Sequence, residues 1–133
     1  MNREALEAAV ALAGQAGHAF VATADSQRLP HLAVAGAVSI EAADQVGVTE
    51  WFCPGTMANL EDNRRVALVI WDPETDRGYQ LLGWVTEVKE QAVIDGYVPE
   101  ASEQAGPQVE RELAIRVGEI LRFRQGPHSD EPG

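Results

Sequence analysis

The segment 65–71 constrains the fold more than any other part of the chain. Its residues Val66-Ala67-Leu68-Val69-Ile70 are apolar at every position. A strand of this kind has no polar face to turn toward water, so it belongs in the middle of a sheet with other elements on both sides. The rest of the chain must supply those elements.

Five further segments have strand composition, and two are predicted to be helical. The predicted strands are residues 18–24, 29–40, 46–52, 79–90 and 112–124. Residues 2–15 show helical spacing, with Asn2 as the cap and Gly14 and Gly17 as the stop. A short helix over residues 57–63 follows the Pro54-Gly55 break. In the last strand the apolar parity slips at Gly118, which predicts a β-bulge.

These elements predict one mainly β domain over residues 1–124. A chain of 133 residues is the size of a single ordinary domain. Six antiparallel strands of this spacing favour a closed or nearly closed barrel, because closure removes unpaired sheet edges. Residues 91–108 have no clear period, and residues 125–133 are predicted to be a flexible polar tail.

The charge of the chain excludes several kinds of partner. Acidic residues outnumber basic ones 21 to 10, for a formal net charge of −11. This argues against nucleic acids and anionic membranes, which require Lys and Arg to neutralise phosphates. No apolar run approaches the roughly 20 residues that span a bilayer, and the N-terminus does not resemble a signal peptide. We therefore expect a cytoplasmic protein. Cys53 is the only cysteine, so no intrachain disulfide forms.

The strand predicted over residues 29–40 has two unusual faces. One carries Leu32, Val34, Val38 and Ile40, and the other carries only His31, Ser39 and the alanines between them. A solvent face normally bears long polar side chains, so small residues indicate that something lies close against the strand. The alternatives are a covering helix, a partner subunit or a planar ring system.

The start of the short helix is a second candidate feature. A helix that opens with Gly55-Thr56 offers free backbone N–H groups and a hydroxyl, which suit a phosphate group. Thr56 is predicted either as a plain N-cap or as a ligand contact as well. Asn59 is predicted either to bond back to the turn or to face the cofactor. The pattern thus favours a protein that carries a phosphorylated cofactor.

Three segments in the same order resemble the pyridoxamine 5′-phosphate oxidase-like family. The segment Ala22-Thr23-Ala24-Asp25 with Pro30-His31 is similar to that family's first hairpin. Ala58-Asn59-Leu60 with Asn63-Arg64-Arg65-Val66 resembles its helix and following strand, and Leu82-Gly83-Trp84-Val85 resembles a later strand. The resemblance covers roughly residues 5–90.

The resemblance implies a homodimeric split β-barrel that binds FMN, or in some relatives F420, in clefts between subunits. By this resemblance the flavin phosphate contacts Gly55, Thr56 and Met57, with Asn59 beside them. The flavin ring lies along Val34, Ala35 and Gly36, and the partner subunit closes the site. Such a protein is a flavin-dependent oxidoreductase that acts on a small molecule.

The chain departs from the family at the positions before Asn59. Relatives that hold FMN tightly have Lys or Arg there, whereas this chain has Gly55, Thr56, Met57 and Ala58. Arg64 is predicted to supply the positive charge that these positions lack, with Arg65, Lys89 and Arg116 as alternatives. A flavin-free split-barrel dimer that acts as a ligand-binding module is the second hypothesis.

The tryptophans, the histidines and the single cysteine do not predict a catalytic or metal site. The three tryptophans at 51, 71 and 84 fall on predicted strands and favour core or interface packing, with Trp84 the candidate to flank a ring. His18, His31 and His128 are too scattered to predict a metal site. Cys53 has no nearby base in the sequence that would make it a nucleophile. No catalytic side chain is assigned.

Overall fold

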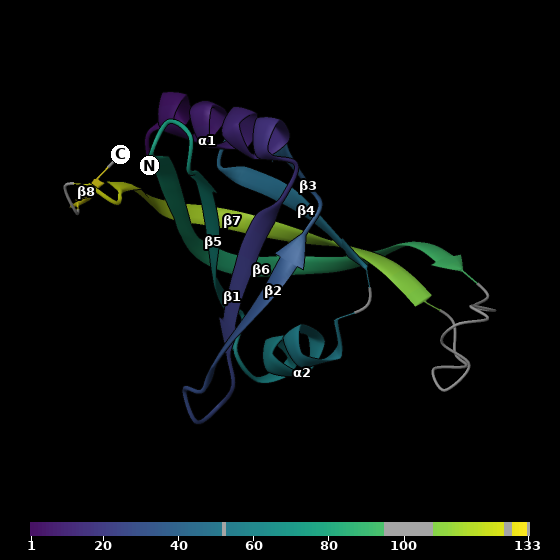
Figure 1. Ribbon diagram of the computed structural model, residues 1–133. Helices are drawn as coiled ribbons and strands as arrows, with labels where there is room; N and C mark the ends of the chain where they lie inside the picture. Colours follow the sequence, from purple (N-terminus) through teal and green to yellow (C-terminus); the bar gives the residue numbers. More distant parts are fainter. Residues whose placement is uncertain (52, 95–107, 127–128, 133) are drawn as a thin grey trace.

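The computed structural model describes residues 1–51, 53–94, 108–126 and 129–132 (Figure 1). The fold is mainly β, with an antiparallel sheet and two helices. The elements in chain order are α1 (Arg3–Ala16), β1 (Ala19–Ala24), β2 (Pro30–Ala35), β3 (Ala37–Ala42), β4 (Gln45–Trp51), α2 (Pro54–Asp62), β5 (Arg65–Asp72), β6 (Arg77–Ile94), β7 (Gln108–Arg124) and β8 (Ser129–Pro132).

The strands form one curved sheet in the order β2-β1-β5-β6-β7-β4-β3, with β8 paired to β7. Strand β5 lies between β1 and β6, as its wholly apolar sequence predicts. In the described residues the sheet has eight strands and is not closed, so the prediction of a mainly β, antiparallel fold is confirmed and its six-stranded barrel is not. Helix α1 covers one end of the curved sheet and α2 lies at the other (Figure 1).

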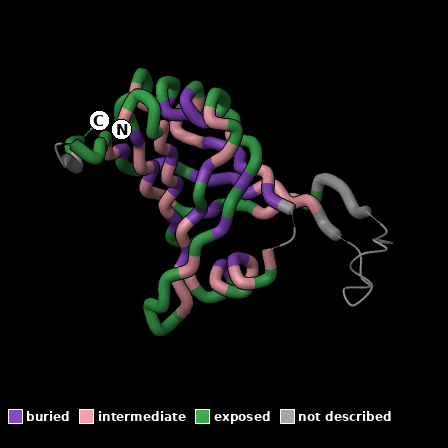
Figure 2. Tube along the Cα trace, viewed as in Figure 1, coloured by how far each residue is buried: buried purple, intermediate pink, exposed green. Residues whose placement is uncertain are grey.

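Helix α1 forms where the sequence predicts it. The side chain of Asn2 accepts hydrogen bonds from the backbone N–H groups of Glu4 and Ala5, and Gly17 ends the helix in the left-handed conformation with φ 80°. The residues that α1 buries are Leu6, Ala9, Leu12 and Ala13. They pack against β-strand residues such as Leu68 and Ile70 in the core (Figure 2).

The segment predicted as one strand over residues 29–40 is two strands. Strand β2 pairs with β1 and β3 pairs with β4, with Gly36 at the bend between them. This change of partner is why the strand count exceeds the prediction. Residues 129–132, within the tail predicted to be flexible, form β8 against the end of β7.

On β2 the small side chains are buried and the large apolar side chains are exposed, which is the reverse of the usual arrangement. Ala33 and Ala35 are buried, and Ala35 belongs to the core, whereas Leu32 and Val34 are exposed. Strand β2 lies close to β4 and α2 on its inner side, so small side chains are needed there. The alanines are therefore covered by the chain's own core.

The bulge predicted at Gly118 is confirmed. Leu82 pairs with Glu119 and Gly83 pairs with Val117, so Gly118 is the extra residue on β7. A Cβ atom at Gly118 would lie 3.4 Å from Cζ3 of Trp84. The bulge thus places the backbone of β7 under the edge of the Trp84 ring.

Candidate functional site

Helix α2 begins three residues earlier than the sequence predicts. Pro54 occupies its first turn and Cys53 is the N-cap residue, with no side-chain cap hydrogen bond. Thr56 therefore lies inside the first turn, and the prediction that it caps the helix is wrong. Because the helix starts at Pro54, the side chain of Thr56 turns toward the sheet instead of the solvent.

Beneath this helix start lies a set of polar side chains that we call the inner polar cluster: His31, Glu50, Cys53, Thr56 and Arg111. Thr56 is fully buried, and its hydroxyl donates to the Sγ atom of Cys53 over 3.3 Å. Glu50 on β4 is only 4% exposed and pairs in register with Arg111 on β7. Side chains of the protein therefore occupy the sheet side of the helix start at which a phosphate was predicted to bind.

Glu50 is an acid held in an unfavourable environment. Burial raises the pKa of Glu50, and this outweighs the nearby Cys53 and Thr56 side chains and the charges of His31 and Arg111, all of which lower it. Neither carboxylate oxygen completes a hydrogen bond within the described residues. An acid of the protein therefore lies beside the first residues of α2, and a phosphate bound there would be close to it.

The other residues predicted to hold the phosphate are also engaged. A Cβ atom at Gly55 would lie 2.6 Å from Nε2 of His31, so the glycine gives the imidazole room against the helix. The Met57 N–H donates to the Cys53 carbonyl over 3.1 Å, and the Met57 side chain packs on the core. The predicted contact through the Thr56 hydroxyl does not fit this arrangement, because that hydroxyl points inward.

Asn59 has a structural role. Its side-chain amide donates to the Oγ1 atom of Thr23 over 3.0 Å and so ties α2 to β1. Thr23 is 4% exposed. The amide thus bonds to β1 and not to the turn as predicted, and contact of Asn59 with a cofactor stays a prediction.

A second region lies on the outside of the sheet. We call it the outer groove; it is a hollow of about 590 Å³ across β1, β5, β6 and the Gly118 bulge of β7. The residues that line it are Ala22, Thr23, Ala24, Asn63, Arg65, Val66, Ala67, Leu82, Gly83, Trp84, Gly118 and Glu119. Its volume falls within the roughly 300–1,000 Å³ of small-molecule sites.

The outer groove combines small, aromatic and cationic residues. Arg65 and Trp84 are cross-strand partners on β5 and β6, and both are exposed. Arg65 makes no ion pair with any of the residues described here. Asn63 accepts a hydrogen bond from the Arg65 backbone N–H over 3.0 Å and shapes the end of the groove beside α2. An anionic, planar molecule suits this combination, since guanidinium groups bind phosphates and aromatic rings stack on flat ligands.

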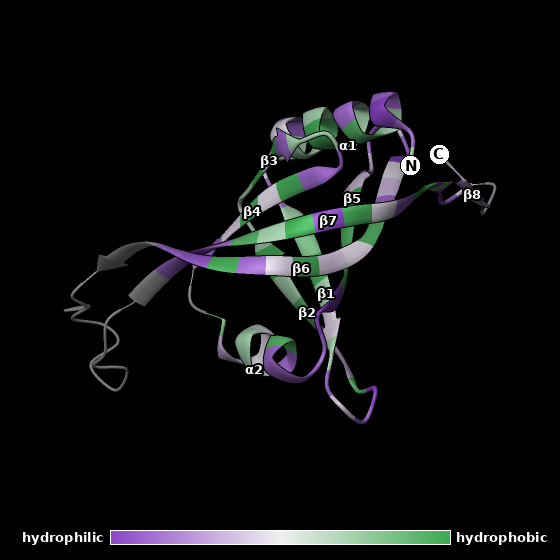
Figure 3. Ribbon diagram, turned by 180° about the vertical axis from the view of Figure 1, so that it is seen from behind, coloured by the Kyte–Doolittle hydropathy of each residue, from purple (hydrophilic) through white to green (hydrophobic). Residues whose placement is uncertain are grey.

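The outer groove continues into an exposed apolar face of β1 and β2. Phe20, Leu32 and Val34 are 37%, 64% and 62% exposed, and Val34 pairs with Phe20 across the strands. Figure 3 shows hydrophobic residues along these strands from behind. Apolar residues grouped in this way on a surface mark a place where another surface binds.

The structure separates the predicted site residues into three groups. Trp84 lines the outer groove, and Val34 lies on the apolar face beside it. Arg64 is exposed next to Arg65, and Gly36 is exposed at the end of β2. Ala35 is 1% exposed, so its side chain lies in the core, and its contact with a flavin ring stays a prediction.

The sequence analysis did not identify the importance of two residues, Arg65 and Glu50. Arg65 appeared only as an alternative to Arg64. Glu50 has the same parity as Val46 and Val48, which are buried on β4, so the period-2 pattern already predicts that it points inward. A charged residue at an inward position of a strand was the available signal.

In the described part of the chain no three His, Cys, Asp or Glu side chains lie together as a metal site would require. No helix among the described residues is long and apolar enough to cross a membrane. The Trp51 side chain, His128 and residues 95–107 lie outside the described residues, so the predictions made for them are not examined by the structure.

Comparison with solved structures reveals the fold. HupZ of Group A Streptococcus superposes with a TM-score of 0.67 at 20% identity, covering 93% of this chain and 96% of HupZ. A pyridoxamine 5′-phosphate oxidase-related, FMN-binding protein of Nostoc punctiforme gives 0.65 at 11% identity, covering 93% and 84%. This chain has the pyridoxamine 5′-phosphate oxidase-like fold. An F420 reductase gives 0.53 at 16% identity, covering 77% and 87%.

The similarity to known proteins is found by comparing structures and not by comparing sequences. No protein-family model and no curated protein matches the sequence. The fold suspected from the three short segments is therefore supported by structural similarity alone, at identities of 20% or less for the proteins named above.

Proposed function

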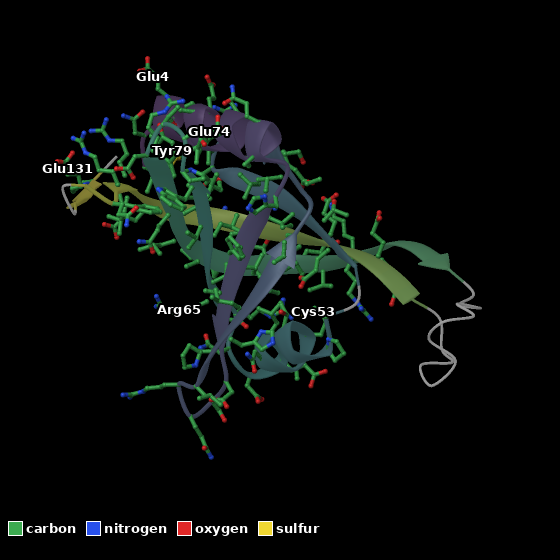
Figure 4. The ribbon with its side chains drawn as sticks, in the orientation of Figure 1. Glu4, Cys53, Arg65, Glu74, Tyr79 and Glu131 are labelled. Carbon is green, nitrogen blue, oxygen red and sulfur yellow. The ribbon has the colours of Figure 1, made fainter. Side chains whose placement is uncertain are left out.

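We propose that this protein binds FMN in the outer groove as a homodimer and serves as a flavin-dependent oxidoreductase. The observation that carries the proposal is the exposed Arg65–Trp84 pair on a groove lined by small residues (Figure 4 labels Arg65 at the end of β5 near α2). Structures with this fold include an FMN-binding protein and an F420 reductase, which agrees with a flavin as the ligand.

Different residues of the outer groove would bind the ring and the phosphate of the cofactor. Arg65, with Arg64 beside it, would bind the phosphate, and Trp84 with Gly83 and Gly118 would take the flat ring. A bound flavin supplies hydride or electron transfer, while the protein positions it and limits the access of water. Val34 and the exposed residues around it would be covered by the second subunit.

This assignment differs from the sequence hypothesis in the placement of both the ring and the phosphate. The ring moves from Val34, Ala35 and Gly36 to Trp84, Gly83 and Gly118. The phosphate moves from the start of α2 to the Arg65 end of the outer groove, because Glu50 and the buried Thr56 occupy the sheet side of the former position. F420 is the alternative ligand, since it also joins a flat ring to an anionic tail. A flavin-free dimer remains the second candidate function, which the carboxylate of Glu50 at the start of α2 favours.

Titration of FMN and F420, followed by fluorescence quenching, tests the proposal. Arg65→Gln removes a charge-assisted hydrogen bond worth about 1.5–3 kcal/mol, so we expect FMN affinity to fall about 10- to 150-fold. Arg28→Asn is the matched control, because Arg28 is exposed in the β1–β2 turn at φ 67°, where asparagine is well tolerated. Its affinity should equal that of the wild type.

Two outcomes would overturn the proposal. Wild-type protein that binds neither FMN nor F420 at millimolar concentration would support the flavin-free dimer. Arg65→Gln protein that binds FMN as tightly as the Arg28→Asn control would remove the outer groove as the site.

A further inference from the structure

Three arginines gather at the end of the β6–β7 ribbon that lies beside α1. Arg77, Arg122 and Arg124 line a hollow of about 360 Å³, which we call the arginine hollow. Its other lining residues are Thr75, Asp76, Gly78, Tyr79, Phe123 and Glu131. The chain has only ten basic residues and a net charge of −11, so three cations around one small hollow are a marked local concentration.

None of the three arginines forms an ion pair within the described residues, and Arg77 Nε donates a hydrogen bond to Thr75 Oγ1 over 3.4 Å. Asp76 accepts hydrogen bonds from the backbone N–H groups of Gln125 and Gly126 over 2.7 and 3.0 Å, and from Trp71 Nε1 over 3.2 Å. These bonds, with the charge of Arg124, lower the pKa of Asp76. Its carboxylate therefore holds the turn after β7. Glu131 on β8 pairs in register with Arg122, but no ion pair forms between these residues in the described structure.

Tyr79 and Arg122 form the wall of the hollow nearest α1. They are cross-strand partners on β6 and β7, and the partly buried Tyr79 ring packs against the core. A second hollow of about 240 Å³ lies between this pair and the first turns of α1. Arg122 thus has a fixed aromatic neighbour and open space on both sides, which suits a guanidinium that binds a ligand.

The arginine hollow is separate from the outer groove. Arg65 pairs with Trp84, whereas Tyr79 pairs with Ile70, five residues further along β5. Five residues of a strand span about 17 Å and reverse the side-chain direction. Ile70 is buried and Arg65 is exposed, which agrees with the two places lying on opposite faces. Figure 4 shows Arg65 and Tyr79 toward opposite ends of the β5–β6 pair, with Glu4 and Glu131 nearer Tyr79.

We propose that the arginine hollow is a second binding site, for the phosphate group of a small phosphorylated molecule. Guanidinium groups bind phosphate oxygens in pairs of parallel hydrogen bonds, and three of them can surround one phosphate. The site lies outside the groove assigned to the flavin. It needs no flavin in order to work, so it stands whether or not the proposed function does.

Isothermal titration calorimetry of the wild-type protein with inorganic phosphate and with adenosine monophosphate tests this site. Arg122→Gln should weaken both ligands about 10-fold or more, because one charge-assisted contact is worth about 1.5–3 kcal/mol. Glu131→Gln should strengthen both, since it removes the acid opposite Arg122. The matched control Arg28→Asn should bind like the wild type.

The ligand pair and a groove variant separate the possible sources of binding. Equal affinity for phosphate and the nucleotide indicates a site for the phosphate alone, and tighter binding of the nucleotide indicates that Tyr79 also contacts the ring; either result supports the site. Trp84→Ala should leave both affinities unchanged while it weakens FMN. Wild-type protein that binds neither ligand at millimolar concentration, or an Arg122→Gln variant that binds both normally, would overturn the proposal.

Discussion

The inner polar cluster and the outer groove contain similar chemistry but differ in access. Each has a cationic side chain, an acid and nearby glycine. In the inner polar cluster the polar atoms face one another under α2, and Glu50 and Thr56 are almost inaccessible. In the outer groove Arg65 and Trp84 are exposed. A helix start is an anion site only when its N–H groups reach an open surface, and here a buried acid, Glu50, lies beside the Cys53 and Thr56 side chains of the helix start.

The largest effect is expected at the apolar face that adjoins the outer groove. Val34→Glu places a charge at a position that is 62% exposed in one chain and that we expect a second subunit to cover. An unpaired charge buried in a contact costs about 3–5 kcal/mol, so dimer affinity should fall more than about 100-fold. Sedimentation velocity over a concentration series measures this directly.

The control for that experiment adds the same charge elsewhere. Ala11→Glu lies on the exposed side of α1, away from the sheet face, and should leave the association unchanged. A wild-type protein that sediments as a monomer at all concentrations, or a Val34→Glu dimer as stable as the control, would show that the apolar face is not the dimer contact.

A smaller effect is expected from Glu50 in the inner polar cluster. Its pKa is raised above the ordinary 4.5, so in the folded state Glu50 keeps a proton that the unfolded chain loses. The resulting stabilisation is complete below about pH 4.5 and is lost as the pH rises through the raised pKa. Glu50→Gln should remove this pH dependence and raise the free energy of unfolding near pH 8 by about 1–2 kcal/mol, the desolvation cost of a buried charge.

Urea denaturation at a series of pH values measures the Glu50 effect. Glu61→Gln on the exposed side of α2 is the control and should keep the pH profile of the wild type. If Glu50→Gln is less stable than the wild type at high pH, the attraction of Arg111 and His31 outweighs the cost of burial, and our account of the cluster is wrong.

The smallest effect is expected at Thr56, and it tests whether the phosphate binds at the inner polar cluster or in the outer groove. Thr56→Val keeps the shape of the side chain but removes the hydroxyl that donates to Cys53, so stability should fall by about 1 kcal/mol. FMN affinity should not change, because the outer groove does not include Thr56. A Thr56→Val protein of normal stability whose FMN affinity drops 10-fold or more would return the phosphate to the start of α2.

Much of the fold could be predicted from local patterns. The cap at Asn2, the stop at Gly17 and the bulge at Gly118 depend on single residues whose backbone preferences are strong. The apolar run of β5 predicts its central place in the sheet. The change of partner at Gly36 could not be predicted, since nothing local distinguishes one bent strand from two.

The candidate site was predicted less completely. Trp84 was singled out because an aromatic residue on a strand must pack or bind, and it lines the groove. Thr56 and Ala35 were assigned to the cofactor from local patterns, yet both are buried. The polar cluster that includes Thr56 also contains His31 on β2 and Arg111 on β7, which lie far from it in the sequence.

The sequence by itself determined most of the segments that become strands and helices, where several of them begin and end, and that the chain carries a strong excess of acids. Only the tertiary structure decided which face of each strand is covered. Alternation of side chains along a strand gives it two faces, but the pairing of strands that are distant in the sequence determines which face packs against the core. For that reason Ala33 and Ala35 face the core while Leu32 and Val34 are exposed, and Arg65 and Trp84 face outward together.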